Sequence, residues 1–119
     1  MANGALIFTW GAAVRGREMK GLEVLGKALA FWDEQEKEGR IHSHREYFAL
    51  TGNATKRTGT MVVEGELGEL LRIQMEDESI RLQTEASQIC ENFCVEICEA
   101  NSEDSINRYV QTLQGMGLS

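Results

Sequence analysis

The order of its hydrophobic periods constrains the fold of this chain more than any other feature. From Leu6 to Leu113, strand-like and helix-like periods follow one another as strand, helix, strand, strand, helix, strand and one further amphipathic helix. A chain of 119 residues has room for one hydrophobic core, so we expect a single domain over residues 1–119.

Four segments have the composition of strands. They are Ala5–Trp10, about Arg40–Leu50, Gly59–Glu64 and Glu91–Glu99. The turn-rich run from Thr51 to Thr55 lies between the second and the third, and this short connection predicts an antiparallel hairpin. The fourth alternates cleanly, with Phe93, Val95 and Ile97 on one face and Cys94, Glu96 and Cys98 on the other.

The helix-like segments differ in length and in what their apolar faces can contact. A long helix should begin near Arg17-Glu18 and end at Gly39, with an apolar stripe of Leu22, Leu25, Leu29 and Trp32. Shorter helical pieces are expected at Glu66–Arg72 and near Glu76–Ser87. The last helix should be capped by Asn101-Ser102, end at Gly115, and dock through Ile106, Tyr109, Val110 and Leu113.

This order predicts an α+β fold of the ferredoxin-like type, β-α-β-β-α-β, with an extra C-terminal helix. Its four-stranded antiparallel sheet would have helices on one face only. The other face carries two cysteines of the fourth strand and apolar residues of the first and third, so we expect the sheet of a second copy to cover it in a homodimer. The alternative is a monomer in which the C-terminal helix lies across that face.

Several short segments resemble one family. They are Trp10-Gly11, Gly16-Arg17-Glu18, Gly26-Lys27-Ala28-Leu29, Gly39-Arg40-Ile41, and Arg81-Leu82 with Glu91-Asn92-Phe93. Together they resemble small uncharacterised proteins of the dimeric α/β-barrel superfamily, over about residues 5–99. That superfamily includes cofactor-independent oxygenases, haem-degrading enzymes, muconolactone-isomerase-like enzymes and stress-response proteins. The resemblance implies the fold and the dimer, and no catalytic set of these families maps onto the chain residue by residue.

Composition limits the partners. A net charge of −7 would repel phosphate backbones and anionic lipid, so we expect neither nucleic acid nor membrane binding. The apolar run at Ala5–Trp10 is too short for a span or an export signal. Three cysteines without disulfide spacing favour the reducing cytoplasm.

The second predicted strand carries the one row of titratable residues with strand spacing. Positions i, i+2 and i+4 of a strand share a face, so His42, His44 and Glu46 would project together. Two imidazoles and a carboxylate could contribute to a ligand pocket, hold a general base, or bind zinc or iron, although a solvated strand produces such a row by chance. We predict a small-molecule pocket with these three as polar contributors and with Trp10 and Phe48 as apolar walls. We assign no metal and no cofactor.

Two classes of function fit these features. The first is a homodimeric binding protein with a small molecule in its barrel. The second is a cofactor-independent oxygenase or isomerase acting on a small ring compound, with His42 or His44 as the base. No catalytic motif separates them, so the sequence leaves open whether the protein is an enzyme.

Overall fold

Four strands and the helices that connect them form the body of this chain, and a further helix follows the last strand. The structure is a computed structural model that describes residues 2–100 and 103–117. The elements in order are β1 (Gly4–Trp10), α1 (Glu18–Lys37), β2 (Ser43–Phe48), β3 (Gly59–Gly65), α2 (Leu67–Gln74), α3 (Asp77–Ile89), β4 (Cys94–Glu99) and α4 (Glu103–Gly115). No helix in the described ranges is long and apolar enough to cross a membrane.

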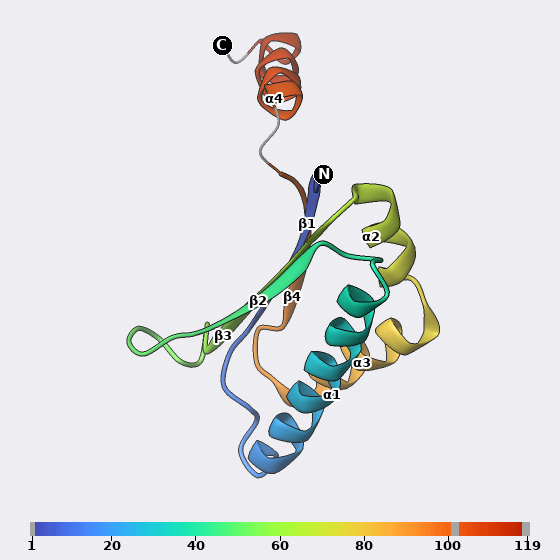
Figure 1. Cartoon of the computed structure of the whole chain (residues 1–119). Coiled ribbons are helices and arrows are strands. Elements are labelled where there is room, and N and C mark those ends of the chain that lie inside the picture. The colour runs from blue at the N-terminus through green and yellow to red at the C-terminus, as the bar shows by residue number, and fades with distance from the viewer. Residues whose placement is uncertain (1, 101–102, 118–119) are drawn as a thin grey trace.

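The strands form one sheet that is covered on one side. Their order is β2-β3-β1-β4, and each neighbouring pair is antiparallel, as the sequence predicts. Figure 1 shows α1, α2 and α3 on the same side of this sheet. Because β2 and β4 are its edges, the sheet of one chain is open, and the expected barrel is not closed within a single copy.

Alternation along the central strand β1 explains the two faces. Leu6 and Phe8 point to the helix side, where they are 0% and 7% exposed. Ile7 and Thr9 point to the other side, where the strands on either side of β1 place Val62 and Glu96 opposite Ile7. Successive side chains of a strand project to opposite faces, so β1 contributes to a core and to an uncovered surface at once.

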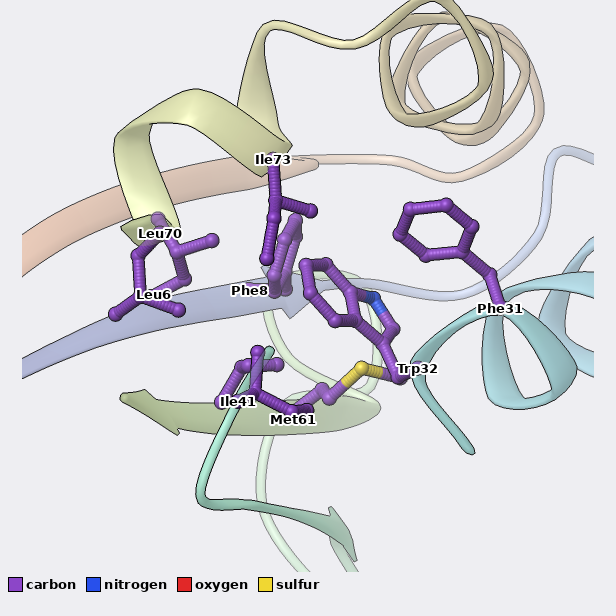
Figure 2. Packing of buried hydrophobic residues seen from close by; sticks show 9 residues of the cluster. Leu6, Phe8, Phe31, Trp32, Ile41, Met61, Leu70 and Ile73 are labelled. Carbon is purple, nitrogen blue, oxygen red and sulfur yellow. The ribbon is translucent and has the colours of Figure 1, made fainter. Parts of the chain in front are cut away.

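The core lies between the helix side of the sheet and α1 and α2. Its buried residues are Leu6, Phe8, Phe31, Trp32, Ile41, Met61, Val63, Leu70 and Ile73. Figure 2 shows how those that it labels pack together. Trp32 of α1 packs on Phe8 with ring centroids 5.9 Å apart and on Phe31 at 4.9 Å. Burying each large apolar side chain contributes about 1.5–3 kcal/mol, so this cluster is the main source of stability.

The strand predicted at Arg40–Leu50 is observed at Ser43–Phe48, and it starts late because the residues before it take part in helix contacts. The Arg40 guanidinium donates to Gln35 Oε1 at 2.8 Å, Glu76 Oε2 at 2.6 Å and Glu69 Oε1 at 3.2 Å. This arrangement fastens the segment after α1 to α2 and to the start of α3. The chain then bends at residues 41–42, and regular pairing with β3 begins only at Ser43.

The position of α4 differs from the docked position expected from its apolar face. The helix has no buried residue, and Figure 1 shows it beyond the end of the sheet, away from α1, α2 and α3. Ile106 and Tyr109 are 65% and 66% exposed. What ties α4 to the sheet is polar: Ser105 Oγ donates to Glu99 Oε2 at 2.7 Å, and Arg108 pairs with the same carboxylate. The cap expected at Asn101-Ser102 lies outside the described residues.

Removing residues 101–119 should therefore leave the body of the protein as stable as before. We expect the melting temperature to change by less than about 2 °C, because a loss of 1 kcal/mol would shift it by about 4–8 °C in a domain of this size. Differential scanning calorimetry of the full and shortened chains is the measurement. A fall of several degrees would show that the apolar face of α4 packs against a surface in solution.

Candidate functional site

A cavity of about 400 Å³ lies between α1, α3 and the end of the sheet where β1 and β2 stop. Aromatic side chains supply much of its wall: Phe8, Trp10, Trp32, Phe48 and Phe93. Helix residues with little or no side chain make room for it, namely Gly21 and Ala28 of α1 and Ala86 of α3. Two of its lining residues, Leu22 and Phe48, are 63% and 52% exposed, so they stand where the cavity meets solvent.

Glycine 59 allows the aromatic pair at one end of this cavity. Gly59 pairs with Trp10 on β1 and with Phe48 on β2, so it lies between them in the sheet. A Cβ at Gly59 would lie 2.4 Å from the Trp10 indole, a distance that a side chain could not tolerate. Because Gly59 has no side chain, the rings of Trp10 and Phe48 pack edge to face with their centroids 6.4 Å apart.

Several polar side chains of the lining already have hydrogen-bond partners. Gln83 Nε2 donates to Ser79 Oγ at 3.0 Å and to the carbonyl of Gln74 at 3.3 Å. Thr58 Oγ1 donates to the carbonyl of Ala54 at 2.8 Å, and Glu18 Oε1 accepts from the backbone N–H of Gly16 at 2.8 Å. Across the described residues, no buried side-chain nitrogen or oxygen lacks a hydrogen-bond partner. Any ligand of such a wall would be selected by shape and apolar contact.

Cys90 is the thiol of the lining, and its surroundings keep it protonated. Burial raises the pKa of Cys90 above its ordinary value, because the thiolate is poorly solvated there. Since the thiolate is the nucleophile, this cysteine lacks the environment of a reactive one.

The five residues predicted to form the pocket fall into three places. Trp10 and Phe48 line the cavity. His44 and Glu46 lie on the helix side of β2 but belong to an ion cluster with α1, outside the cavity lining. His42 precedes β2 and is exposed, and it borders a separate hollow of about 250 Å³ with Arg40 and Glu66. Ligand binding by these residues remains a prediction.

The bend at residues 41–42 separates the two histidines. The bend turns Ile41 into the core and His42 to the outside. The alternation of the strand begins only at Ser43, one residue after His42, so His42 and His44 do not share a face. Among residues 2–100 and 103–117, no three histidine, cysteine or carboxylate side chains are grouped so as to hold a metal ion.

His44 joins β2 to α1 through two carboxylates. Its Nδ1 lies 2.5 Å from Glu46 Oε2, its Nε2 lies 2.6 Å from Asp33 Oδ1, and Glu36 of α1 is 3.9 Å away. The ring is 9% exposed. Burial alone lowers the pKa of His44, but the hydrogen bonds and charges of Glu46 and Asp33 together outweigh it, so its pKa rises above 6.5. A protonated ring can donate to both carboxylates at once.

The helix residues of the lining were not identified as site residues from the sequence. Leu25 and Trp32 look there like ordinary members of an apolar stripe, and in the structure the same stripe also borders the cavity. The signal that could have found the cavity is the placement of Gly21, Ala28 and Ala86 on faces that turn toward one another.

A solved structure shares this architecture. It is a dimeric protein of unknown function and ferredoxin-like fold from Bacteroides fragilis, which superimposes with a TM-score of 0.60 over 81% of this chain and 94% of that one. The sequence identity is 10%, so the likeness concerns the fold alone, and it confirms the ferredoxin-like fold predicted from the order of elements. No family model and no curated protein matches the chain.

The His44 contacts predict a pH dependence of stability. Because the folded-state pKa is raised, the stabilisation is complete below the unfolded value of 6.5 and is lost as pH rises through the folded value. His44→Gln should remove this dependence and cost about 1 kcal/mol at pH 6, since Asp33 is 71% exposed and its share is screened. Urea unfolding between pH 5.5 and 8.5 measures both quantities.

The matched control for that experiment is His42→Gln, which changes an exposed imidazole of the same segment. It should leave the pH profile of the wild type intact. Equal profiles for the wild type and His44→Gln would contradict the role assigned to His44.

Proposed function

We propose that this chain is a homodimeric protein that binds a small, mostly apolar molecule in the cavity between α1, α3 and the sheet. The observation that carries the proposal is the lining: about 400 Å³ bordered by five aromatic side chains, with Thr58, Gln83 and Ser79 already engaged in hydrogen bonds. Ligand sites in proteins are commonly concave and apolar, with volumes of about 300–1,000 Å³. Binding would remove Trp10, Phe48 and the ligand from water together.

Binding is favoured over catalysis by the titratable groups of the lining. An oxygenase or isomerase acting on a ring compound would need a proton-transfer group beside the bound ring. The lining offers Glu18, which accepts a hydrogen bond from Gly16, and Cys90, whose pKa is raised by burial. Neither has a partner within the lining that would make it a base or a nucleophile, so the proposal is a binding protein.

A thermal-shift assay with apolar ring and chain compounds tests ligand binding. We expect naphthalene, 2-naphthoic acid or decanoic acid to raise the melting temperature. A ligand at a free concentration of 100 times its Kd raises the free energy of unfolding by about 2.7 kcal/mol. The protein has two tryptophans, and both line the cavity, so their emission should change in the same titration. Failure of all three compounds to shift either signal would contradict the proposal.

Filling the cavity supplies the matched control. Ala28→Phe places a ring inside the cavity and should abolish ligand stabilisation while the protein stays folded. Ala30→Phe adds the same ring on the exposed side of the same helix and should bind as the wild type does. If Ala28→Phe still responds to the ligand that stabilises the wild type, that ligand binds elsewhere.

Two observations support the homodimer. One face of the sheet has no cover from residues 2–100 or 103–117, and apolar residues of β1 and β3 lie at its centre. The Bacteroides fragilis protein that shares the fold is described as dimeric.

The cysteines are free and Cys94 is exposed, which supports a reducing compartment such as the cytoplasm.

Light scattering at micromolar concentration should therefore give a mass of twice 13.3 kDa. Hydrophobic burial between sheet faces is the physical reason, so the dimer should persist in 0.5 M salt. A mass of 13.3 kDa at every concentration up to 100 µM would reject the homodimer.

A further inference from the structure

The uncovered face of the sheet, called here the open face, has its charges at opposite edges. Its residues, three from each strand, are Ser43, Arg45, Tyr47, Thr60, Val62, Glu64, Ala5, Ile7, Thr9, Cys94, Glu96 and Cys98. Strand pairing places Arg45 beside Val62, Val62 beside Ile7, and Ile7 beside Glu96. From β2 to β4, these four residues are positive, apolar, apolar and negative. We call Arg45, Val62, Ile7 and Glu96 the middle row.

The two charged residues of the middle row have no ion-pair partner in the described part of their own chain. Arg45 and Glu96 are both exposed, and each stands on an edge strand. Two apolar residues and the width of the sheet separate them. Neighbouring strands are about 4.8 Å apart, so three spacings keep the two side chains from meeting within one copy.

We propose that a second copy of this chain packs on the open face with its two-fold axis parallel to the strands, so that Arg45 pairs with Glu96 of the partner subunit. The inference rests on the homodimer of the proposed function and specifies its geometry. Rotation about such an axis reverses the order of the strands and keeps every residue at its level. The middle row then meets its own reverse: Arg45 faces Glu96 of the partner subunit, and Val62 faces Ile7 of the partner subunit.

The alternative face-to-face arrangement is disfavoured by the same charges. A two-fold axis across the strands keeps β2 over the partner's β2 and β4 over the partner's β4. At the middle row it would place Arg45 over Arg45 of the partner subunit and Glu96 over Glu96 of the partner subunit. Like charges in contact oppose association, whereas complementary charges fix the register of an interface. The open face is therefore self-complementary in one orientation only.

The other two rows are compatible with the proposed axis. Tyr47, which is 53% exposed, would cover Cys94 of the partner subunit. Glu64 is the one charge of the open face without an opposite charge across the interface, and it would face the small Ala5 of the partner subunit. In the symmetric dimer, the apolar centre and two ion pairs would stand against two such unmatched carboxylates, one from each copy.

Charge reversal and charge exchange test the pairing. Arg45→Glu and Glu96→Arg should each raise the dimer Kd at least tenfold, because each creates two like-charge contacts in a symmetric dimer. The double variant Arg45→Glu/Glu96→Arg should return to within about threefold of the wild type, since both pairs are restored with their signs exchanged. Arg57→Glu, in the exposed turn between β2 and β3, is the control with the same charge change. Sedimentation equilibrium gives Kd, and melting temperatures check that each variant is folded.

The outcomes separate this inference from the homodimer itself. A monomeric wild type would overturn both. A dimeric wild type whose Kd is unaffected by either reversal, or whose reversals are not rescued by the exchange, would overturn the orientation and leave the homodimer standing.

Cross-linking gives a second readout that does not depend on a measured Kd. Packed sheets lie about 10 Å apart, so a bismaleimide linker of that length can join facing thiols. In Tyr47→Cys, the proposed axis predicts a link from position 47 to Cys94 of the partner subunit. The axis across the strands would instead link Cys94 to Cys98 of the partner subunit, already in the wild type. Mass spectrometry of the linked peptides decides between them, and a 94-to-98 link between subunits would overturn the proposal.

Discussion

The alternation of β1 is the constraint on which the rest of this structure depends. β1 is an inner strand of the sheet, so each of its side chains projects from one face or the other and, where it is apolar, needs a packing partner on that face. Leu6 and Phe8 pack against α1 and α2 and thereby fix where these helices lie on the sheet. Ile7 and Thr9 are partly buried beside the neighbouring strands, and no helix of the described chain packs on them. A single layer of strands thus defines both the core and the surface that a second copy would cover.

The cavity follows from a second property of the same sheet, the local absence of side chains. Because Gly59 has no Cβ, the Trp10 indole can lie against β3. The small side chains of Ala28 and Ala86 leave the space between α1, α3 and the sheet unfilled. The aromatic rings around the space are held by the core: Trp32 packs on both Phe8 and Phe31. A cavity built in this way is preformed, so a ligand would not have to order its wall before binding.

Sequence patterns predicted what depends on neighbouring residues and failed where distant contacts decide. The order of elements, the long helix closed by Gly39 and the alternation of β4 were all readable, because periodicity and a left-handed glycine (φ +77°) are local properties. The start of β2 was not readable, because it depends on Arg40 reaching carboxylates of α2 and α3.

The same distinction applies to the site and to α4. Trp10 and Phe48 were predicted as pocket walls from aromatic character alone, and they do line the cavity. The helix residues that complete the cavity belong to apolar stripes that look like ordinary core until the helices are placed. The apolar stripe of α4 is equally clear in sequence, yet amphipathicity says that a helix needs a partner and does not say which surface supplies it.

Charge, more than apolar area, gives the proposed dimer its direction. Each copy carries a net charge of −7, so bringing two together works against a long-range repulsion that apolar burial and close, complementary pairs together must offset. Apolar contact between Val62 and Ile7 is attractive in any orientation, since the hydrophobic effect is non-directional. The edge charges are what distinguish one orientation from another. Placing Arg45 and Glu96 at opposite edges of one level makes the face complementary to itself, which is the property that a closed two-fold interface requires.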